Sequence, residues 1–162
     1  MDDVAIDLIN GELEPRRHLT TAERRELDEL AALLRRLTET VASGAELSGD
    51  ELAAFNAVIG RTAVVARIEP GGGGRYVLDL TPVGGSEQDR FVRELAGSFG
   101  SILRRAPDRL KLCANQDCGR AFFDRTRSRT RRWCDSGGCG NRARVRRHRA
   151  RRATSTQRYG SF

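Results

Sequence analysis

The chain has 162 residues, of which 38% are hydrophobic and 31% charged, a composition that suits one domain, or one domain with a small appendage. No segment approaches the roughly 18 consecutive apolar residues of a membrane span. The opening Met1-Asp2-Asp3 lacks the basic flank and apolar stretch of a secretory signal. These features argue against a membrane protein and predict a soluble, cytoplasmic one, associated with the nucleoid if it binds DNA.

The net charge of +7 is unevenly distributed along the chain. Residues 1–108 contain 13 Arg against 19 Asp and Glu, a balance of −6, whereas residues 109–162 contain 16 Lys and Arg against 3 Asp, a balance of +13. Lys111 is the only lysine. Because arginine pairs bidentately with phosphate and with guanine edges, the basic part suits a nucleic-acid partner. Codon usage could explain the excess of Arg over Lys, but not its clustering at one end. The same split suggests the hypothesis that the acidic part shields the basic helix until an effector binds.

Hydrophobic periodicity and capping signals predict helices in the acidic part. Residues 4–9 suit either a short strand or a helical turn. Thr20 to Glu23 has the form of a capping box, and an apolar stripe follows it on a helix of about 20 residues. The stripe consists of Leu27, Leu30, Leu34, Leu37 and Val41. Packing within the domain is favoured for this stripe, although it also permits a homodimer. A second box at Ser48 to Glu51 opens a helix that Gly60 ends. Its expected buried face comprises Leu52, Phe55, Val58 and Ile59.

A β-hairpin and a third helix complete the predicted acidic part. Two runs rich in β-branched residues, 62–69 and 75–81, flank the glycines of 71–74 and predict the hairpin. A phosphate-binding loop is disfavoured there, because the glycines lead into a strand and no Lys-Ser/Thr pair follows. The third helix is expected from Ser86 until Pro107 stops it. Its expected inner face comprises Phe91, Leu95, Phe99 and Ile102.

The four cysteines form two C-x4-C pairs separated by fifteen residues: Cys113, Cys118, Cys134 and Cys139. In a reducing cytosol, clustered cysteines more often bind metal than form disulfides. Redox-active pairs usually have C-x-x-C spacing, and a catalytic zinc usually keeps an open position with a His or carboxylate ligand. Four thiolates close the coordination shell, so the pattern predicts one structural Zn²⁺. His148 is a less favoured substitute ligand, and His18 carries no evident chemistry.

Local residues help each cysteine pair to turn back on itself, with Gly119 after the first pair and Gly137-Gly138 inside the second. Between the pairs, residues 120–124 suit a strand whose expected partner is 132–134. One phenylalanine and Trp133 would then cover the metal. So small a module has too little apolar surface to fold alone, and zinc would supply the missing stability.

The segment after the last cysteine predicts a strongly basic helix, because it holds seven arginines between residues 140 and 152 and no proline. Its expected nucleic-acid contacts are Arg142, Arg144, Arg146, Arg147, His148, Arg149, Arg151 and Arg152. Helical spacing places the arginines in two ridges that could straddle a groove. A merely solvated face is disfavoured, because these cations would repel one another without an anion. Composition does not choose between DNA and RNA.

These residues resemble the CGNR zinc-finger family over about residues 108–153. The resemblance rests on the four cysteines, on Trp133-Cys134, on the tetrapeptide Cys139-Gly140-Asn141-Arg142 and on the basic run Arg146–Arg149. It implies the four cysteines as zinc ligands and the helix from Arg142 as the DNA-contacting element. It also implies an N-terminal ABATE domain, whose opening motif Asp7-Leu8-Ile9-Asn10 is similar, and a role as a stress-induced transcription regulator of bacteria.

We therefore expect an α+β protein in three parts. Residues 1–107 form a small helical domain with a β-hairpin, which regulates or dimerises; residues 108–153 form a treble-clef-like zinc finger with a basic helix; residues 154–162 form a disordered tail. The expected function is a zinc-dependent, DNA-binding transcription regulator. The alternatives are an RNA-binding or ribosome-associated zinc protein and a protein-interaction zinc module. We find no nucleophile–base pair, carboxylate pair or cofactor loop, and do not expect an enzyme. The effector is unknown.

Overall fold

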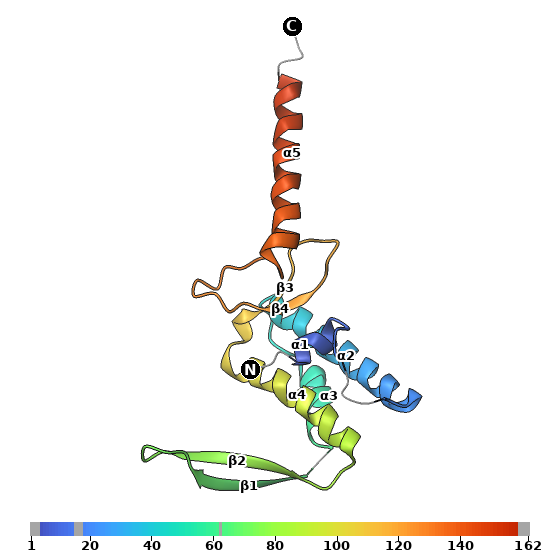
Figure 1. The fold of residues 1–162 in the computed structure, drawn as a ribbon, viewed down its shortest axis with the longest axis vertical. Helices are drawn as coiled ribbons and strands as arrows, with labels where there is room; N and C mark the ends of the chain where they lie inside the picture. The colour runs from blue at the N-terminus through green and yellow to red at the C-terminus, as the bar shows by residue number, and fades with distance from the viewer. Residues whose placement is uncertain (1–3, 15–17, 62, 159–162) are drawn as a thin grey trace.

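The computed structural model describes residues 4–14, 18–61 and 63–158, and it combines helices with two small sheets (Figure 1). In chain order the elements are α1 (Val4–Ile9), α2 (Thr21–Ala42), α3 (Gly49–Ile59), β1 (Ala63–Pro70), β2 (Tyr76–Val83), α4 (Glu87–Arg105), the 3₁₀ turn η1 (Pro107–Arg109), β3 (Leu110–Leu112), β4 (Ala121–Phe123), the π-helical turn η2 (Ser136–Gly140) and α5 (Asn141–Arg158). Each sheet is a two-stranded antiparallel hairpin, β1–β2 or β3–β4. The predicted α+β class is confirmed. Within the described ranges, no helix combines the length and apolar character needed to cross a membrane.

The predicted helices begin where the sequence places their caps. Thr20 and Ser48 each accept a hydrogen bond from the backbone of the glutamate three residues later, whose side chain bonds back to the cap, so both capping boxes are confirmed. Ser86 caps α4 in the same way, with Asp89 as the returning side chain. Residues 4–9, for which the sequence leaves strand and helix open, form α1.

The core lies among α1, α2 and α4. Leu34 and Leu37 of α2 are fully buried there, so the leucine stripe packs within one chain and is not a free dimer interface. Phe99 of α4 is also fully buried, and its ring meets that of Phe55 edge to face with the centroids 5.7 Å apart.

The expected buried face of α3 is partly wrong. Phe55 is buried and Val58 and Ile59 are half-buried, but Leu52 is 43% exposed. The helix reaches the core mainly through the Phe55 ring, which lies next to Gly100 of α4. One turn earlier, Leu52 lies beyond the reach of that contact.

The zinc-finger part shares the core of the helical part. Leu110 of β3 and Ala121 of β4 are each 1% exposed and belong to the same cluster of buried side chains as α1, α2 and α4. β3 lies against α2, and β4 lies against α1. The finger is therefore docked on the helical body rather than joined to it by a free linker.

The β1–β2 hairpin forms as expected, with Ala63 opposite Val83 and Pro70 opposite Tyr76. Three glycines between the strands, Gly72, Gly73 and Gly74, have positive φ, which confirms the turn. Residue 62, the predicted first strand residue, lies outside the described residues. Every residue of β1 is exposed, and Figure 1 shows the hairpin extending below the helices.

Helix α5 extends from the finger at the end of the molecule opposite the β1–β2 hairpin (Figure 1). It continues to Arg158, so the tail expected to be disordered from residue 154 is helical over its first five residues. No glycine or proline interrupts residues 153–158, so nothing in that stretch ends the helix. Residues 159–162 lie outside the described residues. The shielding of the basic helix by the acidic part is wrong for this conformation, because α5 points away from the helical body.

Candidate metal centre and basic helix

The first cysteine pair lies at the turn of the β3–β4 hairpin. Leu110 pairs with Phe123 and Leu112 with Ala121, so the expected pairing of 120–124 with 132–134 is wrong. The reason is the buried face of the hairpin: alternation in Leu110-Lys111-Leu112 places two leucines toward the helical body, a role that the charged segment at 132 cannot fill. Segment 132–134 instead joins the finger through one backbone bond, from Ala114 N–H to Arg132 O at 2.8 Å.

Two backbone features shape the first knuckle. The N–H of Cys113 donates to Arg120 O at 2.8 Å, and the N–H of Cys118 donates to Asn115 O at 2.9 Å. Gly119 follows with a φ of 61°, which a residue with a Cβ rarely adopts. Its carbonyl accepts a hydrogen bond from the guanidinium of Arg35 in α2, so the knuckle is also tied to the helical body.

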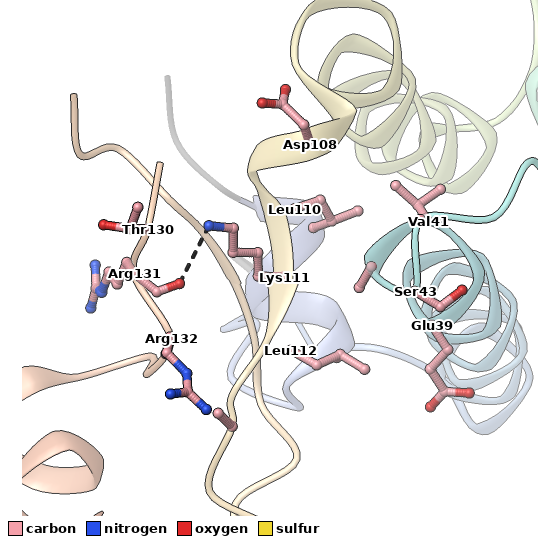
Figure 2. A pocket seen from close by; sticks show the side chains of 13 residues that line it. Glu39, Val41, Ser43, Asp108, Leu110, Lys111, Leu112, Thr130, Arg131 and Arg132 are labelled. Carbon is pink, nitrogen blue, oxygen red and sulfur yellow. Dashed lines mark hydrogen bonds between the residues drawn. The ribbon is translucent and has the colours of Figure 1, made fainter. Parts of the chain in front are cut away.

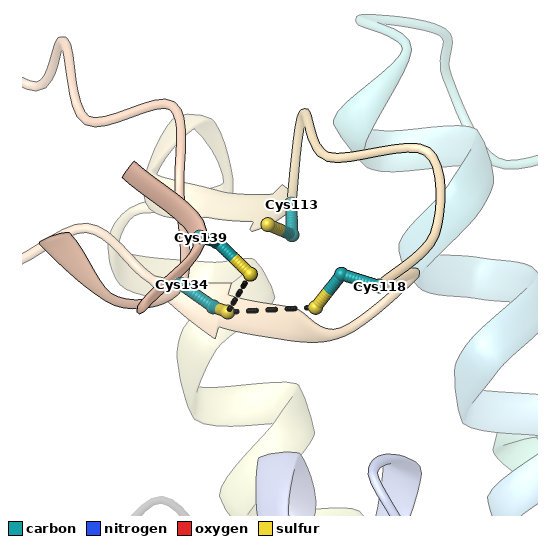
Figure 3. A group of neighbouring side chains, drawn as sticks. All are labelled: Cys113, Cys118, Cys134 and Cys139. Atoms are coloured by element: carbon teal, nitrogen blue, oxygen red, sulfur yellow. Dashed lines mark hydrogen bonds between the residues drawn. The ribbon is translucent and has the colours of Figure 1, made fainter. Parts of the chain in front are cut away.

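The four cysteine Sγ atoms converge on one point, as Figure 3 shows, and all lie within 4.8 Å of one another. Cys118 Sγ is 3.7 Å from Cys134 Sγ, and Cys134 Sγ is 3.9 Å from Cys139 Sγ. Four sulfurs placed about 2.3 Å from a central ion in a tetrahedron lie about 3.8 Å apart, so the spacing fits zinc. No pair is bonded as a disulfide. The described cluster contains only cysteines, and His148 lies on α5 outside it.

Asp135 shapes the second knuckle. Its carboxylate accepts hydrogen bonds from the backbone N–H groups of Gly137 and Gly138 and so caps the turn η2. A Cβ on Gly138 would lie 2.6 Å from Asp135 Oδ2, whereas one on Gly137 would lie at an ordinary 3.8 Å. A side chain at Gly138 would therefore displace this carboxylate from its capping position. Gly140 packs its backbone on the Trp133 ring, where a Cβ would lie 3.7 Å from the ring.

Polar groups around the sulfurs favour charge on one thiol in particular. Arg142 donates to Cys139 Sγ at 3.0 Å, and Asn115 Nδ2 lies 3.7 Å from the same atom. The Arg142 guanidinium and neighbouring donors lower the pKa of Cys139 to about 7. Burial and the neighbouring thiols Cys118 and Cys113 raise the pKa of Cys134 to about 12. Four thiolates held this close need a bound cation to compensate their charge, and a divalent metal supplies it.

Asp124 organises the loop that joins the two cysteine pairs. Its side chain is fully buried and accepts four hydrogen bonds: Lys111 Nζ at 2.7 Å, Thr126 N–H at 3.0 Å, Thr126 Oγ1 at 2.6 Å and Arg131 N–H at 2.8 Å. Lys111 also donates to the carbonyl oxygens of Arg129 and Arg131. One buried ion pair thus fixes both ends of the loop between β4 and Trp133.

A hollow of about 660 Å³ lies between the end of α2 and the finger (Figure 2). Val41 and Ser43 line one wall, and Leu110 and Lys111 line the other. The ammonium group of Lys111 is bonded to Asp124 and to loop carbonyls, and Figure 2 shows the bond to Arg131. The hollow therefore lies at the boundary between the helical body and the finger. Because the ammonium group of Lys111 is already bonded, we assign the hollow no catalytic or binding role.

The structure divides the predicted nucleic-acid contacts on α5 into two groups. Ala143 is buried, Arg142 bonds Cys139, and the Arg147 guanidinium lies 5.8 Å from the Trp133 ring centroid, so this side of the helix faces the finger. Arg142 and Arg147 are exposed all the same, as are the members for which no contact with the finger is described: Arg144, Arg146, His148 and Arg149. Arg151 and Arg152 belong to α5, and their side chains lie outside the described residues.

Three residues of the site were missed by sequence reasoning. They are Asp124, Asp135 and Asn10, whose side chain bonds the β4 backbone. Asp135 precedes two glycines, which is a signal for an Asx-type turn. Asp124 bonds Thr126 two residues later, which is also a local turn signal, but its bonds to Lys111 and to the Arg131 backbone depend on burial. Asn10 carries no local signal, because its partner is distant in sequence.

A family model described as the CGNR zinc finger matches residues 109–152. This segment holds all four cysteines, the Asp124 loop and the first part of α5. No curated protein matches the chain. The C-terminal part thus matches a zinc-finger family and holds a four-cysteine cluster suited to zinc. The ABATE resemblance of the N-terminal part and the expected domain limits stay predictions.

Proposed function

We propose that this chain is a DNA-binding transcription regulator in which one structural Zn²⁺ holds α5 in a fixed pose. The observation that carries the proposal is the set of exposed arginines on the projecting part of α5. Among the described residues, no carboxylate pairs with Arg144, Arg146 or Arg149. These cations repel one another, and a polyanion that binds α5 removes that repulsion.

The donor set supports a structural role for the metal. Cys113, Cys118, Cys134 and Cys139 offer four sulfur ligands and leave no position for a substrate. The bound ion would compensate the thiolate charges and join the two knuckles. The two strands that flank the first knuckle have only three residues each, and no strand pairs the first knuckle with the second, so the described strands alone do not hold the knuckles together. Cys139 lies two residues before the start of α5, so the metal would also set the direction of the helix.

The size and exposure of α5 suit the major groove of DNA. Its 18 residues span about 27 Å, and a helix fits the major groove, where arginine reads guanine. Phosphate contacts by these arginines would make the affinity strongly dependent on salt, with a log–log slope of about −0.9 per neutralised phosphate.

Selection of bound fragments from random duplex DNA tests this function. We expect an enriched sequence motif in the presence of zinc and its loss after chelation. Absence of any enriched motif with fully zinc-loaded protein contradicts sequence-specific regulation.

A charge-matched pair of variants tests the role of α5. Arg146→Ala with Arg149→Ala should weaken binding to duplex DNA and reduce the salt slope by about 2. The control, Arg24→Ala with Arg25→Ala, removes the same charge from an exposed part of α2. Equal loss in both variants would show that net charge, and not α5, drives binding.

One observation favours RNA as a second candidate. Trp133 is half-buried, with the Arg132 and Arg147 guanidinium groups 5.6 and 5.8 Å from its ring centroid. An aromatic ring beside arginines can stack an unpaired base. Competition between duplex DNA and structured RNA separates the two candidates. Weak binding to both, insensitive to salt, would favour a protein-interaction module.

A further inference from the structure

The β1–β2 hairpin has one face made only of apolar side chains. The register pairs Ala66 with Leu80 and Ile68 with Leu78, and side chains alternate between the two faces of a strand. One face, hereafter the apolar face, therefore presents Val64, Ala66, Ile68, Tyr76, Leu78 and Leu80. On the opposite face Arg67 lies across from Asp79, and Glu69 across from Val77. The opposite face also carries Ala63, Val65, Thr81 and Val83 and is therefore mixed. The hairpin thus has one mixed face that holds its charged side chains and one face without charge.

Nothing in the described part of the chain covers the apolar face. Five of its side chains are 44% to 75% exposed, with Tyr76 at the upper end. No hairpin residue of the described ranges belongs to the core cluster or packs against it. An isolated two-stranded hairpin is marginally stable in water, and further strands or a second layer packed against it are needed to stabilise it. This face exposes on the order of 500 Å² of apolar surface, at the upper end of what a monomer tolerates.

We propose that the apolar face is a homodimer interface, covered by the same face of a second copy of this chain. The proposal goes beyond DNA binding and does not depend on it. Two such faces together would remove on the order of 1,000 Å² from water, about the lower limit for a specific interface. Since the face carries no charge, it fits an equally uncharged surface, and its own copy provides one.

The shape of the face suits pairing around a two-fold axis. Tyr76, the largest side chain, lies at the turn end of the hairpin, whereas Val64 and Ala66 lie at the other end. An antiparallel stack of two hairpins places the bulky end of each over the small end of the other, with Ile68 and Leu78 in the middle. The result is a four-stranded, two-layer sandwich.

The position of the hairpin permits this approach. It extends from the helical body at the end opposite α5 (Figure 1), so a second copy can reach it without meeting the basic helix. Charges separated by more than about 8 Å are largely screened at physiological salt, so the basic parts of the two copies do not oppose the contact.

Two neighbouring substitutions on one strand test the proposal. Leu78→Lys places a charge on the apolar face, and Val77→Lys places the same charge on the opposite face. Leu78 and Val77 are 61% and 50% exposed, so both variants should fold, which circular dichroism confirms. Sedimentation velocity of the zinc-loaded full chain, without DNA, should show a concentration-dependent dimer for the wild type and for Val77→Lys. Leu78→Lys should weaken dimerisation by at least about tenfold.

Hydrogen exchange gives an independent readout. Backbone amides of residues 63–69, 76–81 and 83 should exchange more slowly as the wild-type concentration rises, and at an unchanged, fast rate in Leu78→Lys. A wild type that stays monomeric at high micromolar concentration overturns the proposal, as does an equal effect of both substitutions. Binding of the monomer to phosphatidylcholine vesicles through this face, without dimerisation, would also overturn it. None of these outcomes bears on zinc or DNA binding.

Discussion

The side-chain amide of Asn10 bonds both backbone groups of Ala121. Asn10 Nδ2 donates to Ala121 O at 3.1 Å, and Ala121 N–H donates to Asn10 Oδ1 at 3.0 Å. Asn10 follows α1 directly, and Ala121 begins β4, so 111 positions separate the partners. The amide thus satisfies the free edge of β4 and joins the first turn of the chain to the zinc finger.

Replacing Asn10 should loosen the finger from the helical body. Asn10→Ala leaves the N–H and C=O of Ala121 without partners at a half-buried site, so we expect a loss of about 2 kcal/mol in the free energy of unfolding. Urea denaturation of the zinc-loaded chain measures it. The control is Asn56→Ala, on the exposed side of α3, where we expect a change within about 0.5 kcal/mol. Similar losses at both positions would show that Asn10 has no special role.

Substitution of Arg142 should affect metal binding and substitution of Arg146 should affect nucleic-acid binding, although the two residues carry the same charge. The Arg142 guanidinium bonds Cys139 Sγ at 3.0 Å, so Arg142→Ala should weaken zinc binding by about tenfold, as removal of an outer partner of a ligand does. Arg146→Ala should leave zinc affinity unchanged and weaken binding to DNA. Competition with a chromophoric chelator measures zinc affinity, and a mobility shift measures DNA binding. Unchanged zinc affinity in Arg142→Ala would contradict the structure.

Gly137 and Gly138 offer a test of the second knuckle that changes no charge. An alanine Cβ at Gly138 would lie 2.6 Å from Asp135 Oδ2 and displace the carboxylate that caps η2. Gly138→Ala should therefore lower zinc affinity by about tenfold. Gly137→Ala places its Cβ 3.8 Å from the same carboxylate and should bind zinc like the wild type. Competition with the same chromophoric chelator measures the zinc affinity of both variants. Equal affinities for Gly137→Ala and Gly138→Ala would contradict this account.

The buried carboxylate of Asp124 should contribute more to the free energy of unfolding than an exposed carboxylate does. Asp124→Asn replaces an acceptor of four hydrogen bonds by an amide whose NH₂ faces other donors, and we expect a loss of about 3 kcal/mol. Asp108→Asn breaks an exposed pair with Arg129 and should cost at most about 1 kcal/mol. Thermal unfolding at constant zinc compares the two variants, and comparable losses would argue against a buried ion pair.

The contribution of Asp124 should depend on pH in one direction. Burial raises the pKa of Asp124, but the bonds from Lys111, Thr126 and the Arg131 backbone outweigh burial and lower the pKa below its ordinary value. A group with a lowered folded-state pKa stabilises the fold fully above its unfolded pKa of about 4 and loses this effect as the pH falls through the folded value. The stability difference between the wild type and Asp124→Asn should therefore stay constant from about pH 7 to about pH 5 and shrink only below about pH 4. A stability difference that already shrinks between pH 7 and pH 5 would show that the pKa of Asp124 in the folded state is not lowered, and would contradict this account.

The sequence indicated features whose physical cause is local. Capping boxes at Thr20 and Ser48, the four-cysteine spacing and the turn at Gly72 to Gly74 depend on neighbours within a few residues, and each prediction was confirmed. The partner of β4 could not be found in this way, because residues 110–112 and 132–134 both lie close enough in sequence to pair. Residues 110–112 are the observed partner, because their leucines are buried against α2. Asn10 was missed because its partner Ala121 is distant in sequence. Arg142 was predicted as a nucleic-acid contact, but its bond to Cys139 Sγ was not foreseen, because that bond depends on how the metal centre folds.

Among the described residues, the contacts that hold helix α5 to the finger lie near its first turns, so its far end is sensitive to small shifts at its base. The fixed end comprises Cys139, Gly140 on the Trp133 ring, and Arg142 on the Cys139 sulfur. A helix of 18 residues is about 27 Å long, so a tilt of about 10° at Cys139 would displace the last turn by about 5 Å. A displacement of that size exceeds the spacing of adjacent base pairs, about 3.4 Å. In the proposed complex with DNA, exchange of zinc for a larger ion at the same four sulfurs would therefore change which bases the distal arginines can reach, without altering a single residue of the helix.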